Sequence, residues 1–291
     1  LAFAPDSTAL AFSYSTPRSA SNIYYWDWAA MGQGVRPLTQ MPHGGIPTTS
    51  FVDAELIRYP TFDDRLIPAW LYRPRAAATP MPVVVIVHGG PESQARPGFD
   101  FMAQYLVNRG YAVLVPNVRG STGYGNAYSH LDDVDKRLDS VADLAQAAHW
   151  LRAQAEFDGS RIAVQGGSYG GYMVLGALAF HADLWAAGVD IVGIANFVTF
   201  RENTSDYRRQ HRESEYGRLA TDRELLERVS PIHHVERMTA PLLVIHGAND
   251  PRVPLSEAQQ LVARLAALGR TADLLVFDDE GHGIKLLKNK R

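Results

Sequence analysis

The fold of this 291-residue chain is decided by Arg161-Ile-Ala-Val-Gln-Gly-Gly-Ser-Tyr-Gly-Gly171 and the adjoining Tyr172-Met-Val-Leu-Gly-Ala-Leu-Ala-Phe180. The stretch opens with a short apolar run of strand type and closes with an apolar run of helical type. Between them a serine stands in a glycine-rich turn, where side chains would leave little room. A serine hydroxyl is a weak nucleophile unless it is held exposed beside a base and backbone donors. The stretch therefore predicts a nucleophilic Ser168 on a strand-to-helix turn.

Strand-type and helix-type patterns alternate on both sides of this turn. An antiparallel hairpin is predicted over 54–59 and 66–72, and strands over 83–87, 112–115, 162–164, 187–191, 242–245 and 274–277. Helices are predicted near 99–109, 140–155, 171–181, 223–229 and 256–268. Continuously apolar strands that alternate with helices indicate a mostly parallel sheet covered on both faces. A G-x-S-x-G turn in such a sheet is typical of the α/β-hydrolase fold, whose ligands bind at the carboxyl ends of the strands.

Composition excludes several classes of function. The chain is 46% hydrophobic, has a net charge of −3 and contains no cysteine. The small charge favours neither nucleic acid nor an anionic membrane as a partner, and no apolar run is long enough to span a bilayer. Without cysteine there is no disulfide, thiol nucleophile or thiolate metal site. We expect a cytoplasmic protein with no metal and no cofactor.

The two ends of the chain differ from its middle. Residues 1–45 contain two short aromatic-rich strands, at 9–15 and 22–28, separated by turn residues. They are similar to part of one β-propeller blade. We expect residues 1–45 to be a partial blade and linker, and residues 46–291 to be a catalytic domain whose last helix is truncated. Both ends are interpreted as cuts in a longer polypeptide.

A serine nucleophile needs a base, and the base needs an orienting carboxylate. In this fold they follow the serine in the order Asp or Glu, then His. Asp250 follows the strand 242–245 and is the predicted orienter, with a turn-forming role as the alternative. His282, between two glycines after the last strand, is the predicted base. Three competing carboxylates lie in the base's own loop and are expected to shape it: Asp278, Asp279 and Glu280.

An oxyanion hole is required because negative charge develops on the substrate's carbonyl oxygen during attack. One donor is expected to be the backbone N–H of Tyr169. The other is expected from the loop 88–91, with the N–H of Gly90 preferred and that of Gly89 as the alternative.

For other residues near the strand ends we expect structural or substrate-binding roles. His88 and His246 are expected to be buried structural histidines, and the glycine-rich loop 117–125 is expected to line the pocket. Candidates for an apolar substrate pocket are Tyr124, Trp185, Phe197 and Val253. Arg252 is expected either to bind a substrate carbonyl or carboxylate, or to be a salt-bridge partner.

Taken together, these residues resemble the catalytic domain of the prolyl oligopeptidase family of serine peptidases, above all its acylaminoacyl-peptidase and dipeptidyl-aminopeptidase-like members. The motifs that carry the resemblance, in the family's order, are His88-Gly-Gly-Pro91, Asn117-Val-Arg-Gly-Ser-Thr-Gly-Tyr-Gly125, Gly166-Gly-Ser-Tyr-Gly-Gly171, His246-Gly-Ala-Asn-Asp-Pro-Arg-Val-Pro254 and Asp279-Glu-Gly-His-Gly283.

The resemblance implies an α/β-hydrolase fold, a Ser168/Asp250/His282 triad and an oxyanion hole from Gly90 and Tyr169. It further implies hydrolysis of short or N-acylated peptides through an acyl-enzyme, with a propeller in front of the hydrolase. A carboxylesterase that acts on small esters is the alternative, because triad and oxyanion hole serve both reactions. A non-catalytic binding module of the same fold is the third interpretation.

Overall fold

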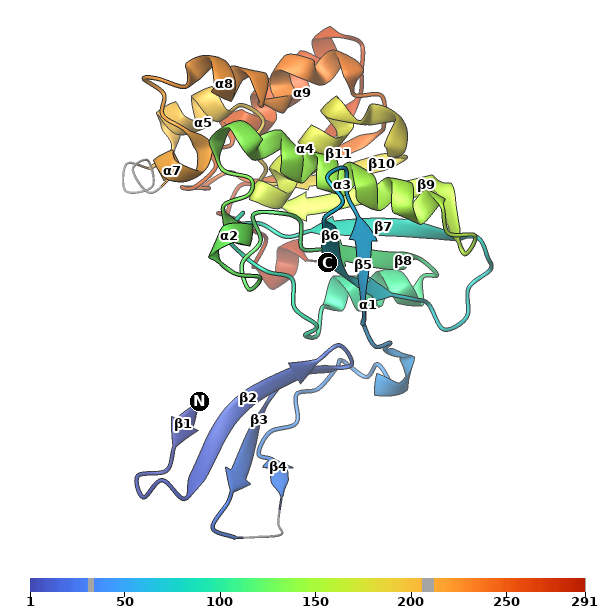
Figure 1. Cartoon of the computed structure of the whole chain (residues 1–291), viewed down its shortest axis with the longest axis vertical. Helices are drawn as coiled ribbons and strands as arrows, with labels where there is room; N and C mark the ends of the chain where they lie inside the picture. Colours follow the sequence, from blue (N-terminus) through green and yellow to red (C-terminus); the bar gives the residue numbers. More distant parts are fainter. Residues whose placement is uncertain (31–33, 206–211, 291) are drawn as a thin grey trace.

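The computed structural model describes residues 1–30, 34–205 and 212–290. Its centre is an eight-stranded sheet in the order β12-β11-β10-β9-β7-β8-β6-β5 (Figure 1). Neighbours from β12 to β8 are parallel, and the β6 and β5 edge is antiparallel. The strands are β5 (Glu55–Pro60), β6 (Leu66–Tyr72), β7 (Met81–Val87), β8 (Ala112–Pro116), β9 (Phe157–Gly167), β10 (Ala187–Ile191), β11 (Leu242–Gly247) and β12 (Ala272–Phe277).

The α/β-hydrolase fold predicted from the alternating pattern is confirmed. Each predicted strand and the predicted hairpin is present, with β9 longer than expected at both ends. The central strands are apolar on both faces because both faces are buried, and Val85 and Val164 are wholly inaccessible to solvent.

Helices cover the two faces of this sheet. In β8, Ala112 and Leu114 belong to one hydrophobic cluster and Val113 to another, so the clusters lie on opposite faces. The larger cluster holds residues of α3 and α4, and the smaller one holds residues of α1. The helices are α1 (Phe101–Asn108), α2 (Asn126–Ser129), α3 (Arg137–Arg152), α4 (Tyr169–Phe180), α5 (Phe197–Asn203), α7 (Glu213–Tyr216), α8 (Arg223–Arg228) and α9 (Ser256–Ala267).

Helix α4 is apolar all round because it lies in the middle of the larger cluster. From Tyr169 to Ala179 every residue is buried. Such a helix shows no amphipathic period. The continuously apolar sequence after Ser168 therefore indicates a helix that is buried on all sides.

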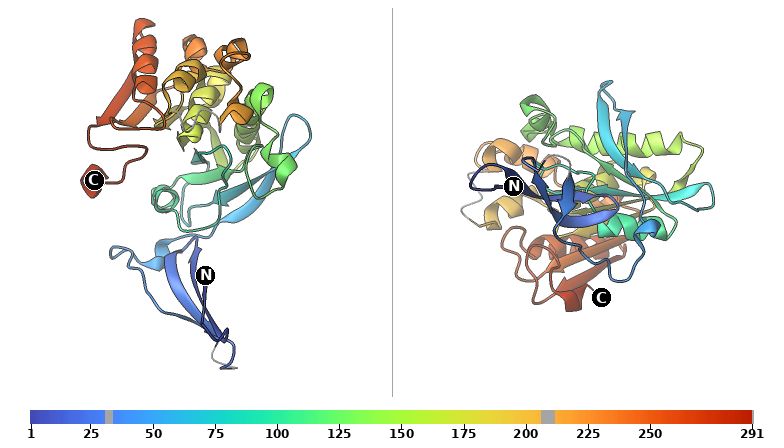
Figure 2. Two further views of the ribbon diagram at one scale, coloured as in Figure 1. Left: turned by 90° about the vertical axis from the view of Figure 1, so that its left-hand side faces the viewer. Right: turned by 90° about the horizontal axis from the view of Figure 1, so that it is seen from below.

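The N-terminal strands form a separate four-stranded antiparallel sheet in the order β1-β2-β3-β4. Figure 1 and Figure 2 show this sheet standing off one end of the hydrolase body. Phe99 N–H donates to Ser15 Oγ (2.9 Å), and Gln104 Nε2 donates to the Pro17 carbonyl (2.9 Å) across the junction. The strands are β1 (Ala2–Phe3), β2 (Ala9–Thr16), β3 (Ser19–Asp27) and β4 (Val35–Pro37).

Two of these strands, β2 and β3, were expected from the sequence, whereas β1 and β4 are too short to show a pattern. The predicted boundary between residues 45 and 46 falls in the connection between β4 and β5, and it stays a prediction. Across the described ranges, no helix has the length and apolarity needed to cross a bilayer.

Candidate active site

Ser168 stands at the turn between β9 and α4. Its backbone has φ 60° and ψ −120°, a conformation that costs about 1–3 kcal/mol in a residue other than glycine. The turn is held by the Ser168 N–H, which donates to the Ile191 carbonyl (2.8 Å), and by the Ser168 carbonyl, which accepts from Gly171 N–H (2.9 Å). Neighbouring β10 therefore helps to hold Ser168 at the carboxyl end of the sheet.

Two glycines of the motif are required by close backbone approaches. A Cβ on Gly166 would lie 2.3 Å from the Gly170 carbonyl oxygen, and a Cβ on Gly170 would lie 2.3 Å from the Val87 carbonyl oxygen. Any side chain at either position would force β9, α4 and β7 apart. The G-x-S-x-G spacing is thus a packing requirement of this turn.

The structure brings the three predicted triad residues together from three loops. His282 Nε2 lies 2.9 Å from Ser168 Oγ, and His282 Nδ1 lies 2.7 Å from Asp250 Oδ2. A carboxylate only accepts, so Nδ1 carries the proton and Nε2 is left as the acceptor for the serine hydroxyl. This is the arrangement that a serine nucleophile, its base and an orienting carboxylate require.

Asp250 is held as a carboxylate by several donors. Burial would raise its pKa, but the hydrogen bond from His282 and the backbone N–H groups of Val253 and Arg252 lower the pKa below its ordinary value. Those two N–H groups donate to Asp250 Oδ1 at 3.0 Å and 2.8 Å. Oδ2 is therefore left to face the imidazole.

Two of the three competing carboxylates in the base's loop bind groups other than His282. Glu280 accepts from the N–H groups of Lys285 and Leu286, at 3.1 Å and 2.8 Å. Asp279 pairs with Lys288. Both contacts organise the chain after His282, as expected for residues that shape this loop.

The two candidate oxyanion loops lie against the nucleophile. Tyr169 is the first residue of α4, where backbone N–H groups have no partner within the helix. A Cβ on Gly89 would lie 3.3 Å from Ser168 Cβ, so the loop 88–91 packs on the turn. Gly90 N–H stays our preferred second donor and Gly89 N–H the alternative.

Of the two histidines expected to be structural, His246 is buried, His88 is partly buried, and both are hydrogen-bonded. His246 Nε2 bonds the Val253 carbonyl (2.9 Å), and burial lowers the pKa of His246. His88 Nε2 lies 2.9 Å from Ser121 Oγ, which connects the loop 88–91 to the loop 117–125. Burial also lowers the pKa of His88.

The predicted pocket residues fall into different places. Phe197 opens α5 beyond the carboxyl end of β10 and contacts the rings of Tyr172 (4.8 Å) and Tyr216 (4.9 Å). Tyr124 is partly exposed, and its hydroxyl accepts from Asn117 Nδ2 (2.9 Å). Phe197 is buried in the larger hydrophobic cluster, whereas Tyr124 lies on the loop that follows β8.

Three further pocket candidates have other surroundings. Val253 is buried and belongs to the larger hydrophobic cluster. The Arg252 side chain is exposed, while its N–H bonds Asp250. Trp185 precedes the first residue of β10 and so lies at the amino end of the sheet, opposite to Ser168. A pocket role beside Ser168 does not fit that position, and we withdraw it.

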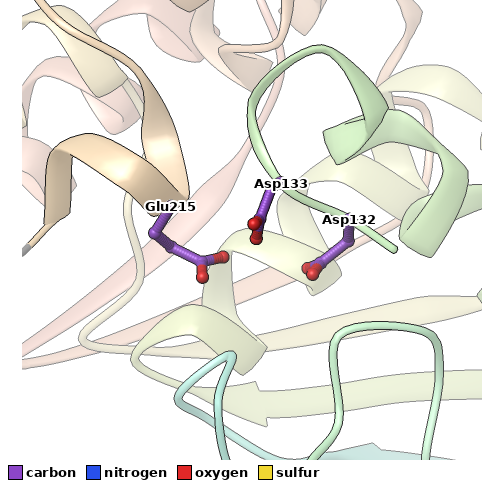
Figure 3. Close-up of side chains that lie close together, drawn as sticks. All are labelled: Asp132, Asp133 and Glu215. Carbon is purple, nitrogen blue, oxygen red and sulfur yellow. The ribbon is translucent and has the colours of Figure 1, made fainter. Parts of the chain in front are cut away.

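Sequence reasoning missed a buried charged cluster beneath Tyr169. Asp132, Asp133 and Glu215 converge with carboxylate oxygens within 4.8 Å of one another (Figure 3). Such a group could hold a cation. However, the buried Arg137 already bonds Asp132 and Glu215, so a positive charge from the protein itself occupies the centre. Glu215 lies 78 positions from Arg137 in the sequence, so no local pattern predicts the cluster.

Comparison with models of protein families shows which family the chain belongs to. A model of the prolyl oligopeptidase family matches residues 97–291, more than half of the chain. The chain belongs to the prolyl oligopeptidase family. A model of acetyl xylan esterase matches residues 47–139, a region that ends before Ser168. The resemblance expected from the motifs is thereby confirmed.

Relatives and solved structures agree with this membership. The chain is 36% identical over 218 residues to dipeptidyl peptidase family member 6 of Caenorhabditis elegans, covering 73% of this chain and 30% of the relative. It is 35% identical over 243 residues to dipeptidyl aminopeptidase BIII of Pseudoxanthomonas mexicana, covering 79% and 35%. The crystal structure of a puromycin hydrolase superposes with a TM-score of 0.89 at 26% identity, over 96% of this chain and 43% of that one. The chain thus spans about a third of the length of these curated relatives.

Proposed function

We propose that this chain is the catalytic part of a serine peptidase that hydrolyses short or N-acylated peptides through an acyl-enzyme on Ser168. The observation that carries the proposal is the hydrogen-bonded row from Ser168 Oγ through His282 to Asp250, at 2.9 Å and 2.7 Å. Membership of the prolyl oligopeptidase family and the peptidase names of its relatives support a peptide as substrate.

Acylation begins when Ser168 Oγ attacks the scissile carbonyl carbon and its proton passes to His282 Nε2. The carbonyl oxygen becomes an oxyanion, which the N–H groups of Tyr169 and Gly90 stabilise. Asp250 accepts from Nδ1–H throughout and stabilises the imidazolium. The tetrahedral intermediate then collapses, the carbon–nitrogen bond breaks, and Nε2–H gives its proton to the leaving amine. The acyl group remains on Ser168 as an ester.

Deacylation repeats these steps with water as the nucleophile. His282 Nε2 takes a proton from the water as its oxygen attacks the ester carbonyl. The second tetrahedral intermediate expels Ser168 Oγ, which recovers the proton from His282. The products are a carboxylic acid and the free enzyme. No step draws on a metal or cofactor, and the proposal includes none.

The esterase alternative has weaker support, because the acetyl xylan esterase match excludes Ser168, Asp250 and His282. For Arg252 we keep the two expected roles, substrate contact or salt bridge, and for Tyr124 and Phe197 the pocket role. The absence of cysteine supports a cytoplasmic setting as part of the same proposal. Residues 1–45 are proposed to be part of a propeller blade, supported by their separate antiparallel sheet.

Fluorophosphonate labelling tests the proposal directly. We expect one adduct, mapped to Ser168 by intact mass and peptide mapping, and none in the Ser168→Ala variant of unchanged circular dichroism. Hydrolysis of a peptide anilide at a rate comparable with its matched ester would favour the peptidase. Labelling together with turnover of the ester alone would favour the esterase, and a folded chain without labelling would refute both.

A further inference from the structure

Arg137 of α3 is one of the largest fully buried side chains of the described residues, with 1% exposure. Its Nη1 donates to Asp132 Oδ2 (2.5 Å) and to the Tyr169 hydroxyl (2.8 Å). Its Nη2 donates to the carbonyl oxygen of Glu215 (2.5 Å) and to the carboxylate of the same residue. One guanidinium therefore joins the residue after the nucleophile to helix α7.

The Tyr169 side chain is fixed from several sides. Its hydroxyl also lies 3.1 Å from Asp132 Oδ2 and 3.1 Å from Ser140 Oγ. Its ring stacks on that of Tyr216, with centroids 6.3 Å apart and planes at 18°. The Arg137 guanidinium lies 5.2 Å from the first ring and 5.0 Å from the second. A planar cation that both hydrogen-bonds and stacks holds such rings with little freedom.

The charges of the buried carboxylates explain why a guanidinium is needed in this cluster. Two buried carboxylates, of Asp132 and Glu215, face a single guanidinium. Burial raises the pKa of both carboxyls, that of Glu215 to about 7, against the lowering effect of Arg137. Removing the guanidinium would leave two uncompensated acids in the core. The cluster therefore keeps Arg137 charged and in one position.

The residue just before α7 also contacts the segment that follows the loop 88–91. Arg212, just before α7, lies 5.7 Å from the Tyr216 ring and pairs with Glu92 at 2.6 Å. Glu92 follows Gly90 by two residues. This outer pair is partly exposed and contributes little energy by itself. It nonetheless links the start of α7 to the segment that follows Gly90.

We propose that Arg137 is a positioning residue for the reaction, which fixes Tyr169 against Glu215 and so aims the Tyr169 N–H at the oxyanion. The inference rests on the proposed function, because it assumes that Tyr169 supplies an oxyanion donor. Arg137 touches no reacting atom and acts through Tyr169. Glu215 and Asp132 hold the guanidinium in turn.

Tyr169→Phe tests the inference because it removes only the hydroxyl that Arg137 contacts. Loss of an entire oxyanion donor lowers kcat by about 10²–10³-fold, and we expect a misaimed donor to lower kcat by roughly tenfold with KM changed by less than about twofold. The rate of inactivation by a fluorophosphonate should fall by the same factor. Glu215→Gln, which leaves the guanidinium less firmly held, should lower both rates in the same direction.

Tyr172→Phe is the matched control. Tyr172 lies one turn further along α4, is equally buried, and its hydroxyl donates to the Val229 carbonyl (3.2 Å), outside the cluster. We expect Tyr172→Phe to have a lower melting temperature than wild type, as Tyr169→Phe does, but to keep the wild-type kcat. A Tyr169→Phe enzyme with lowered melting temperature but wild-type kcat and labelling rate would overturn the inference.

Two further outcomes are decisive. If Tyr169→Phe does not fold, wild-type kcat in folded Glu215→Gln overturns the inference, and a lowered kcat at constant KM supports it. If wild-type enzyme is not labelled at all, the proposed function fails, which is a different result from equal labelling of wild type and variant.

Discussion

Replacing Asp250 by asparagine isolates the orienting role of the carboxylate. Asp250 Oδ1 accepts two backbone N–H groups, and Oδ2 faces His282 Nδ1 at 2.7 Å. In the variant the amide oxygen keeps the two backbone donors, so the amide NH₂ faces the imidazole. Nδ1 must then accept, and the ring proton moves to Nε2. His282 can no longer take the proton from Ser168.

The expected loss follows from that tautomer. Holding the base in the wrong tautomer lowers kcat by about 10⁴-fold in serine peptidases, equivalent to about 5 kcal/mol of transition-state free energy. Melting temperature at neutral pH should fall only by the part that the carboxylate's charge contributes, because the backbone hydrogen bonds survive. The assay is kcat on an activated ester and a peptide anilide, beside thermal unfolding. Asp279→Asn is the control, because Asp279 lies in the loop of His282 and pairs with Lys288. This variant should retain full kcat.

Acid unfolding adds an independent check on Asp250. Its pKa is lowered in the folded state, so its charge stabilises the fold above the unfolded-state pKa of about 4. That contribution is lost as the pH falls through the lowered folded-state pKa, and Asp250→Asn should lack this part of the acid transition. Activity of Asp250→Asn within tenfold of wild type, with Asp279→Asn inactive, would refute the assignment and make Asp279 the orienter.

Three further predictions concern stability. Gly170→Ala should lower the unfolding free energy by about 3 kcal/mol, because its Cβ would lie 2.3 Å from the Val87 carbonyl oxygen. Gly167→Ala, whose Cβ would lie at an ordinary 3.7 Å from the Ile191 carbonyl oxygen, is the control for urea denaturation, and equal losses would contradict the packing argument. Burial raises the pKa of Glu257 to about 7, so the folded state binds the extra proton and wild type should lose up to about 3 kcal/mol between pH 4.5 and 7. Glu257→Gln should flatten that slope, and an unchanged slope would show that another group carries it. Arg119 makes two 2.8 Å hydrogen bonds to the buried Asp143, and Arg119→Ala should cost about 3–5 kcal/mol in denaturant unfolding by leaving that carboxylate unpaired; a loss below about 1 kcal/mol would mean that water replaces the guanidinium.

Local pattern was enough to predict the sheet and to single out the three residues that the structure joins by hydrogen bonds. Continuously apolar strands have few interpretations, and the order of Ser168, Asp250 and His282 follows from the connectivity of the fold. The prediction that Trp185 lines a pocket beside Ser168 is wrong, and the order of the strands in the sequence explains why. Because Trp185 comes before its strand and Ser168 after a parallel one, the two lie at opposite ends of the sheet.

The cluster around Arg137 could not have been predicted in the same way. Arg137 and Glu215 are 78 positions apart and meet only because α3 and α7 pack beside Tyr169. A charged residue at the start of a helix is ordinarily solvated. The sequence predicts a helix near 140–155, whereas α3 begins at Arg137 with that side chain buried.

The difference between these two outcomes follows from how the site is built. The proposed catalytic groups follow β9, β11 and β12, strands whose apolar runs determine where each loop emerges. The aromatic wall beside Tyr169 comes instead from α5 and α7, through Phe197 and Tyr216, which meet at 4.9 Å. These short helices lie in a polar segment without a repeating apolar pattern. Because the proposed catalytic groups depend on the sheet and these rings depend on α5 and α7, the apolar pattern of the strands predicts the first and not the second.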